Sequence, residues 1–308
     1  MGAIFCIGSI IDSKKMDEMK RVVVIGASSL IGHFLLPRLV AEKYSVVAIS
    51  RNPDEKSAAL AGCEWRRVDI GESALSVTPP YALIHLAPLW LLPELLQRSS
   101  SLPERIIAFS STSRISKSTS TSEQEREVAD KLAQAEEHIA RVASELAIPW
   151  TIFRPTLIYG AGLDKNVTTI AHFIRRFRFL PLVGKAEGKR MPVHADDLAV
   201  ACLNCFAQEN TQNKIYNLSG GEALRYREMV ARIFHALGKK PRFLPLPRQG
   251  LERVLGLLAY LPRFSHVTPE MVNRMSQDLV FDSAEAVADF GYSPRKFNPT
   301  KADLMGEG

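Results

Sequence analysis

Apolar residues near the start of the chain fall into short blocks that polar turns separate. The first block, residues 22–25, is a continuous apolar run typical of a strand buried on both faces. Further strands are predicted at 45–50, 64–69, 81–86, 105–110 and 150–154, of which 64–69 is the most polar. Helical or turn material separates consecutive blocks, and strands that alternate with helices indicate a parallel, doubly wound sheet. We therefore expect an α/β fold.

A long amphipathic helix is predicted over residues 122–146. Its apolar positions recur at helical spacing, at Val128, Leu132, Ala135, Ile139, Val142 and Leu146. Beyond Gly160 the pattern loosens into helices interrupted by prolines, with a short strand predicted at 214–218. The segment 113–122 is polar and rich in serine, which predicts a flexible stretch.

Small residues connect the first strand to the first helix, in the sequence GASSLIG at 26–32. Such a turn lets the backbone approach a phosphate, which the free N–H groups and the positive end of the helix dipole stabilise. This is where the pyrophosphate of a dinucleotide binds in a Rossmann-type fold. The regular glycine spacing would place glycine at 29, where this chain has Ser29. Its hydroxyl could replace the lost contact, or its Cβ could displace the phosphate, and we predict that binding is retained.

These patterns suggest three parts. We expect an N-terminal extension over residues 1–18, a dinucleotide-binding Rossmann domain over 19–160 and a mainly helical substrate-binding lobe over 161–308, with a return to the sheet around 190–220. The second strand ends in Ser50, Arg51 and Asn52. No carboxylate stands there to accept a ribose hydroxyl, and a guanidinium can pair with a 2′-phosphate. NADP(H) is therefore preferred, while NAD(H) stays possible if Arg51 is simply exposed.

The amino-acid composition limits the classes of binding partner that are expected. The 308 residues carry a formal charge of +6 and have a pI near 9.1, which suits an anionic small-molecule substrate. The Lys and Arg residues are scattered and form no recognisable nucleic-acid module, so no nucleic acid is expected. Cys202 and Cys205 are predicted to pack within a helix and to bind no metal. The apolar stretch 3–11 is too short for an integral membrane segment, and we expect a cytoplasmic protein.

The turn at 26–32, Arg67-Val68-Asp69, His85-Leu86-Ala87, Phe109 to Thr112, Arg154 to Gly160 and Pro192 to Ala199 together resemble the extended short-chain dehydrogenase/reductase family. The resemblance runs from about Arg21 to the C-terminus. Its members include nucleotide-sugar epimerases and dehydratases, so it implies a sugar-nucleotide substrate and a possible homodimer. In combination with the turn and the end of the second strand, it predicts these cofactor-binding residues: Gly26, Ser28, Ser29, Leu30, Ile31, Gly32, Ser50, Arg51, Asn52, Asp69, Ile70, Leu86, Ala87, Pro88, Ser110, Pro155, Thr156 and Leu157.

The family's acid/base pair is missing. Its members use a Tyr-x-x-x-Lys pair on the long helix, and the predicted helix at 122–146 contains no tyrosine. Lys131 can stand for the lysine, but Glu127 occupies the tyrosine position. Thr112, with Ser111 beside it, matches the family's Ser or Thr after the fifth strand. Either Glu127 or a residue of the substrate lobe replaces the tyrosine, or the cofactor is held without turnover, or hydride transfer and water suffice.

Members without the pair include an NADPH-binding accessory subunit of respiratory complex I, which this chain resembles at residues 192–199. An assembly or regulatory protein is therefore the alternative to an oxidoreductase or an epimerase/dehydratase-like enzyme. In that same segment we interpret His194 and Asp196 as the start of a helix. Arg175 and Arg178 are predicted to share a helix face and to bind the diphosphate of a sugar nucleotide, or to be a solvated face. The apolar segment 251–261 is interpreted as a core helix, with a partner or membrane-surface contact as the alternative.

Overall fold

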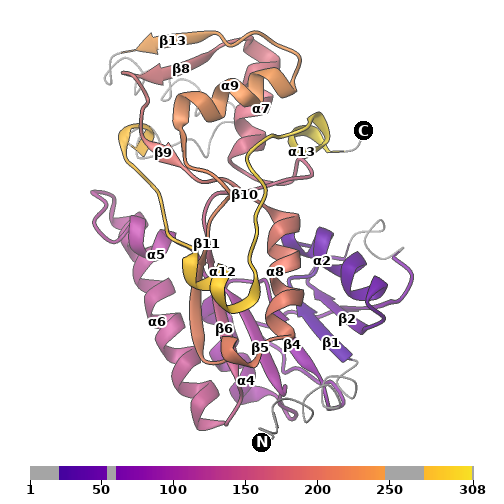
Figure 1. The fold of residues 1–308 in the computed structure, drawn as a ribbon. Helices are drawn as coiled ribbons and strands as arrows, with labels where there is room; N and C mark the ends of the chain where they lie inside the picture. Colours follow the sequence, from indigo (N-terminus) through magenta and orange to yellow (C-terminus); the bar gives the residue numbers. More distant parts are fainter. Residues whose placement is uncertain (1–20, 54–59, 247–273, 307–308) are drawn as a thin grey trace, which may run out of the picture.

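The computed structural model describes residues 21–53, 60–246 and 274–306, and shows a parallel sheet with a smaller lobe beyond one of its ends (Figure 1). The sheet has seven strands in the order β11-β6-β5-β4-β1-β2-β3, and every pairing between them is parallel. The strands are β1 (Arg21–Ile25), β2 (Ser45–Ser50), β3 (Cys63–Arg67), β4 (Ala82–His85), β5 (Arg105–Phe109), β6 (Trp150–Pro155) and β11 (Lys214–Leu218). The predicted α/β fold is confirmed.

The last strand joins the sheet after the chain has left it. β11 pairs along β6, from Lys214 beside Thr151 to Leu218 beside Pro155. The residues between these two strands build part of the second lobe. Because the chain leaves the sheet at the carboxyl end of β6 and later returns, the two lobes are connected by several chain segments.

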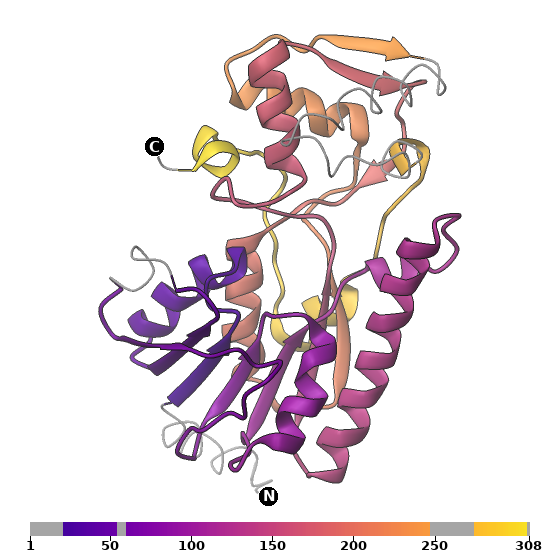
Figure 2. The ribbon, with the colours of Figure 1, turned by 180° about the vertical axis from the view of Figure 1, so that it is seen from behind.

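Helices cover both faces of the sheet, because alternate strand residues face opposite ways. Val22 and Val24 of β1 pack with the helices α2 (Leu30–Ala41), α8 (Ala195–Phe206) and α12 (Ala284–Phe290). Val23 and Ile25 pack with α4 (Leu92–Arg98) and α6 (Glu123–Glu145) on the other face, which Figure 2 shows from behind. A turn of 3₁₀ helix, Leu89–Leu91, leads into α4, and another, Glu209–Thr211, precedes β11.

The structure confirms the predicted long helix over most of its length. α6 buries Leu132, Ala135, Ile139 and Val142 as the periodicity predicts. Its ends differ, since Val128 and Leu146 are each 38% exposed. The segment before it also differs, because Ser113–Ser116 forms the short helix α5. The stretch 113–122, predicted to be flexible, thus contains one short helix.

The second lobe has its own apolar core. It consists of the helices α7 (Val167–Phe177), α9 (Tyr226–Ala236) and α13 (Lys301–Met305) and of short strand pairs. These pairs are β7 (Ile158–Tyr159) with β10 (Val193–His194), β8 (Leu180–Val183) with β13 (Phe243–Leu246), and β9 (Lys189–Arg190) with β12 (Leu224–Arg225). A further 3₁₀ turn, Arg274–Ser276, lies against β8.

The C-terminal segment, yellow in Figure 1, passes between the two lobes twice. From the turn at Arg274–Ser276 it runs down to α12, which contacts β11, and it then climbs to α13, which contacts α7. Both cysteines of the pair, Cys202 and Cys205, are fully buried in α8 as predicted. No helix in the described ranges is long and apolar enough to cross a membrane. The predicted extension 1–18 and the apolar segment 251–261 lie outside the described residues.

Candidate functional site

Two cavities meet at the carboxyl end of the sheet. The smaller, of about 310 Å³, lies over the ends of β1, β2 and β4, and the larger, of about 660 Å³, lies between the sheet and the second lobe. Ser29 and Leu86 line both cavities, so the two cavities lie side by side. Ligands of α/β folds bind at this edge of the sheet.

The turn between β1 and α2 depends on its two glycines. Gly26 has a φ of +74°, and a Cβ there would lie 2.8 Å from the backbone nitrogen of Ala87. A Cβ on Gly32 would lie 2.1 Å from the carbonyl oxygen of Ala27, so this glycine lets α2 pack closely on the turn. Both residues are therefore fixed by the fold itself.

Ser29, which replaces the expected middle glycine, begins the helix. Its hydroxyl accepts a hydrogen bond from the backbone N–H of Gly32 at 3.2 Å, the contact of an N-cap. The next two N–H groups, those of Leu30 and Ile31, have no acceptor within the part of the chain that the structure describes. An anion at this helix start would find two free donors and the positive end of α2, so the turn fits a phosphate.

The end of β2 forms the rim of the smaller cavity. The hydroxyls of Ser28 and Ser50 lie 2.7 Å apart, and Ser50 also accepts the backbone N–H of Asn52. Arg51 is exposed on this rim. Asp69, across the cavity, accepts the N–H of Gly71 at 2.9 Å and so shapes the turn after β3.

Most of the predicted cofactor residues line one cavity or the other. The smaller cavity contains Gly26, Ser28, Ser29, Ser50, Arg51, Asn52, Asp69, Ile70, Leu86, Ala87 and Pro88. The larger contains Ser29, Leu30, Ile31, Leu86, Thr156 and Leu157, together with Ser111 and Thr112. Gly32, Ser110 and Pro155 line neither cavity.

The two candidate hydroxyls after β5 differ in how they are engaged. Thr112 is buried and donates its O–H to the carbonyl oxygen of Pro155 at 3.1 Å. The Ser111 oxygen accepts the N–H of Ser113 at 3.1 Å, which leaves its own proton available to a ligand. Of the two, Ser111 is the hydroxyl that can donate into the larger cavity.

A buried carboxylate supports this turn from behind. Glu136 of α6 is 2% exposed and accepts the hydroxyl of Ser110 at 2.5 Å. It also pairs with Arg154 of β6 and with Arg114 of α5, at 2.8 Å to the Nε of each. Glu136 thus connects three elements whose ends border the larger cavity. In the sequence it is one of several glutamates on an amphipathic helix, and nothing there distinguishes it.

Four predicted site residues lie away from both cavities. Glu127 and Lys131 are exposed on α6, and Arg175 and Arg178 are exposed in the second lobe. The prediction that the two arginines share a helix face is wrong, because α7 ends at Phe177. Arg178 follows as its cap with a φ of +65°.

Sequence reasoning missed several polar residues of the larger cavity: Lys117, Lys165, Arg190 and Tyr226. Burial raises the pKa of Tyr226 to about 12, while the Arg190 cation acts in the opposite direction. The Arg190 guanidinium lies 5.7 Å from the centre of the Tyr226 ring. The chain offers no local motif for these residues, which are brought together from different elements by the packing of the lobes.

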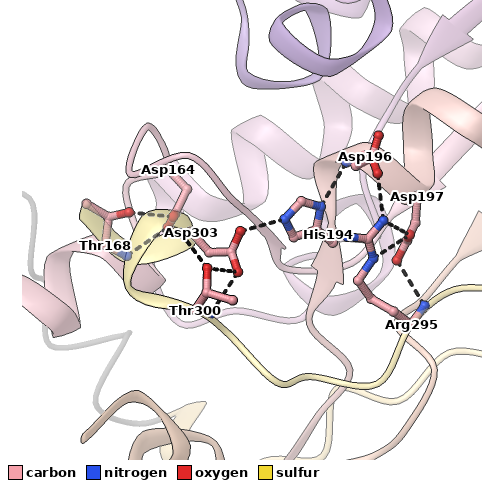
Figure 3. A network of polar contacts seen from close by, with 8 residues as sticks. All are labelled: Asp164, Thr168, His194, Asp196, Asp197, Arg295, Thr300 and Asp303. Atoms are coloured by element: carbon pink, nitrogen blue, oxygen red, sulfur yellow. Dashed lines mark hydrogen bonds and ion pairs between the residues drawn. The ribbon is translucent and has the colours of Figure 1, made fainter. Parts of the chain in front are cut away.

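The motif at 192–199 fastens the C-terminal segment rather than forming part of a cavity (Figure 3). His194 caps α8 by accepting the N–H of Asp196, and its other ring nitrogen lies 3.0 Å from Asp303. The predicted helix start is confirmed, with His194 as the capping residue. Burial opposes ionisation of Asp196, but hydrogen bonds from Arg38 and Arg295 lower its pKa. Asp197 accepts both the backbone N–H and the side chain of Arg295.

The parallel sheet and the glycine turn form a Rossmann-like α/β fold, as solved epimerase structures do. Residues 103–219, less than half of the chain, match the model of the NAD dependent epimerase/dehydratase family. The matched part runs from β5 to the start of the loop after β11 and includes the motif at 192–199.

Three curated relatives share 24–28% sequence identity with this chain. UDP-glucose 4-epimerase of Vibrio cholerae is 26% identical over 37% of this chain and 35% of its own length. Subunit 9 of the NADH dehydrogenase 1 alpha subcomplex of Arabidopsis thaliana is 28% identical over 37% of this chain and 28% of its own length. Divinyl chlorophyllide a 8-vinyl-reductase of Oryza sativa subsp. indica is 24% identical over 88% of this chain and 68% of its own. The chain thus spans about a third of the first two relatives.

Solved structures match over nearly the whole fold. UDP-glucose 4-epimerase of Thermotoga maritima, solved with UDP-glucose, aligns with a TM-score of 0.66 at 16% identity, over 92% of this chain and 96% of its own. UDP-glucuronic acid 4-epimerase of Bacillus cereus, solved with NAD, aligns with a TM-score of 0.68 at 16% identity, over 93% and 95%. At these identities the likeness concerns the fold.

Proposed function

We propose that this chain is an NADP(H)-dependent oxidoreductase that binds its cofactor across the two cavities and reduces a small molecule in the larger one. The observation that carries the proposal is the adjacency of the two cavities, which share Ser29 and Leu86 in their linings. An extended dinucleotide would lie with its adenosine half over β2 and β3 and its reactive end at the larger cavity. When bound, the cofactor supplies a hydride there.

The choice of NADP(H) rests on the end of β2. Arg51 is the cationic side chain on the rim of the smaller cavity among the described residues, and a guanidinium pairs well with a 2′-phosphate. Ser50 and Asn52 add polar groups beside it. The family model and the NAD complex of a structural neighbour support a nicotinamide dinucleotide, and the preference for its phosphorylated form is the part we propose.

A reductase is favoured over a sugar-nucleotide epimerase for two reasons. The arginines expected to hold a diphosphate lie outside both cavities, and the acid/base pair of the family is absent from α6. Ser111 orients the group to be reduced, and Tyr226 is the candidate proton donor in the wall of the larger cavity. The reductase that aligns with 88% of this chain supports the same reaction class.

The test is calorimetric titration of the purified full chain with NADPH, NADP⁺, NADH and NAD⁺, repeated with Arg51→Ala. We expect phosphate-selective binding that falls about tenfold in the variant, because one exposed guanidinium–phosphate contact is lost. Arg67→Ala, an exposed arginine at the end of β3 outside the smaller cavity, is the matched control and should bind NADPH normally. Failure of the unmodified chain to bind any of the four would overturn the proposal.

A second candidate is a cofactor-holding assembly or regulatory protein. It is favoured by the missing tyrosine and by the similarity to a subunit of NADH dehydrogenase over part of the chain. The two functions are separated by a single-turnover experiment, in which bound NADPH is followed at its nicotinamide absorbance while candidate acceptors are added. An assembly protein would keep NADPH reduced with every acceptor.

A further inference from the structure

The wall of the larger cavity is mostly apolar. Side chains from the sheet, the second lobe and the C-terminal segment face it, among them Ile170, Phe173, Met191, Met229, Met275 and Phe281. Three of these six are methionines, whose unbranched side chains adapt to irregular ligands. A cavity of about 660 Å³ is in the range that encloses a drug-sized molecule, so an apolar body of that size fits.

The charged groups of the same cavity are unbalanced. Its described lining contains three cations, Lys117, Lys165 and Arg190, and one carboxylate, Asp164. Asp164 is committed to the start of α7, where it accepts the N–H groups of Asn166 and Thr168 and the hydroxyl of Thr168. Among the described lining residues, cations therefore outnumber carboxylates.

The two lysines differ in availability. Lys117, just after α5, lies 3.3 Å from Glu125 and is partly neutralised by it. Lys165, just before α7, is exposed and makes no ion pair with any residue that the structure describes. An anionic group at the Lys165 side of the cavity would gain a charge partner without displacing one.

From this combination we infer that the larger cavity binds an amphipathic anion, a molecule with an extended or polycyclic apolar body and one carboxylate-like group held by Lys165. The inference rests on the proposed function, because it takes the cavity beside Ser111 as the substrate site. A nucleotide sugar, with two phosphates and many hydroxyls, would place many of its polar groups against the apolar part of the wall. The inner hydroxyls at Ser111, Ser113 and Ser116 are left to orient the reacting end.

The experiment uses the full chain saturated with NADPH and the fluorescent carboxylate cis-parinaric acid as the probe. We expect saturable binding of one probe per chain, displaced by dodecanoate but not by UDP-glucose. The variant Lys165→Ala should weaken displacement by dodecanoate about fivefold and leave displacement by methyl dodecanoate unchanged, because only the acid carries a charge. Lys185→Ala, an exposed lysine outside the cavity, should change neither.

A second variant tests the wall. Ile170→Gln replaces a partly buried apolar side chain with a polar one of similar length, and it should weaken both the acid and the ester by about tenfold. Thermal unfolding of each variant shows that it is folded. Displacement by UDP-glucose, or binding that neither variant changes, would overturn the inference.

Separate measurements distinguish failure of the proposed function from failure of the inference about the substrate. NADPH binding is measured in its own titration, and probe binding is measured with and without NADPH. If NADPH binds and the probe does not, the substrate class is wrong and the cofactor site stands. If the probe binds as expected and NADPH does not, the apolar anion site stands and the proposed reductase is wrong.

Discussion

The backbone N–H and the guanidinium of Arg295 both donate to the carboxylate of Asp197, at 3.0 and 2.7 Å. Arg295 belongs to the C-terminal segment, and Asp197 lies in the first turn of α8. A second carboxylate, Asp196, holds the far end of the same guanidinium and also pairs with Arg38 of α2. The acidic pair of the motif at 192–199 therefore ties three distant parts of the chain together.

Removing this tie should loosen the C-terminal segment. We expect Arg295→Ala to cost about 1 kcal/mol of the free energy of unfolding, a modest value because the Arg295 side chain is 46% exposed. Backbone amides near residues 292–298 should exchange faster with deuterium. Lys296→Ala, the exposed neighbour, is the control and should leave exchange unchanged.

Changing the buried carboxylate of α6, Glu136, should cost more stability than Arg295→Ala. Glu136→Gln keeps the shape of the side chain but leaves Arg114 and Arg154 without their anion, so we expect a loss of about 3–5 kcal/mol in the free energy of unfolding by urea. Glu137→Gln, an exposed change on the next residue of the same helix, should shift stability by less than about 0.5 kcal/mol. Equal effects of the two substitutions would contradict the buried cluster.

The glycine turn can be tested against a glycine of the same backbone conformation. Gly26 and Gly238 have φ values of +74° and +67°, but a Cβ meets backbone atoms only at Gly26. Gly238→Ala should cost about 1 kcal/mol for the conformation alone. Gly26→Ala should cost about 3 kcal/mol, because the clash with Ala87 adds to that strain. Equal melting temperatures for the two variants would show that the close approach at Ala87 is unimportant.

The free energy of unfolding should decrease as the pH is lowered, because of a buried histidine at the end of β4. Burial lowers the pKa of His85 to about 4, despite its hydrogen bond to the Pro88 carbonyl, and its value in the unfolded chain is near 6.5. Between these pH values the unfolded chain binds a proton that the folded chain does not. Stability is thus present above pH 6.5 and is lost as the pH falls toward 4, by about 3 kcal/mol in all.

Urea unfolding of the unmodified chain and of His85→Gln at several pH values tests this. Glutamine can keep the bond to Pro88 without titrating, so the slope of stability against pH between 4 and 6.5 should decrease. His33→Gln changes an exposed histidine and serves as the control, with a slope like that of the unmodified chain.

Turnover, once a substrate is found, separates the candidate acid/base groups. Tyr226→Phe should lower kcat by about a hundredfold, because a proton donor in the cavity wall is removed with little change in packing. Glu127→Ala and Lys131→Ala should leave kcat unchanged, since both side chains are exposed on α6 away from the cavities. The reverse result would indicate that the acid/base groups lie on α6.

Most of the sheet could be predicted from the sequence because its inner strands, such as β1, β4 and β5, are short and largely apolar, whereas the edge strand β3 is mostly charged. The predicted bounds of β2 and β11 agree with the structure at both ends, and β5 differs by one residue. In the smaller cavity, the glycine turn and the end of β2 were predicted from the residues themselves, whereas Asp69, Ile70, Leu86, Ala87 and Pro88 were predicted from the family resemblance.

The larger cavity could not be predicted in this way. Lys117 and Tyr226 are more than a hundred residues apart, and their meeting depends on how the second lobe packs over the sheet. The end of α7 at Phe177 also gave no signal, because Arg178 adopts a left-handed conformation that usually indicates glycine. Glu136 shows the same limit, since burial and partners distinguish it from its neighbours while its place on the helix does not.

Ser29 and Leu86 form part of the wall of both cavities, and this has a consequence for the order in which two ligands bind. A molecule seated over β1 and β2 would complete the floor on which a second molecule rests. Steady-state kinetics should then be sequential with the dinucleotide arriving first and leaving last. The oxidised dinucleotide would compete with the reduced one, and the second product would be a noncompetitive inhibitor against it.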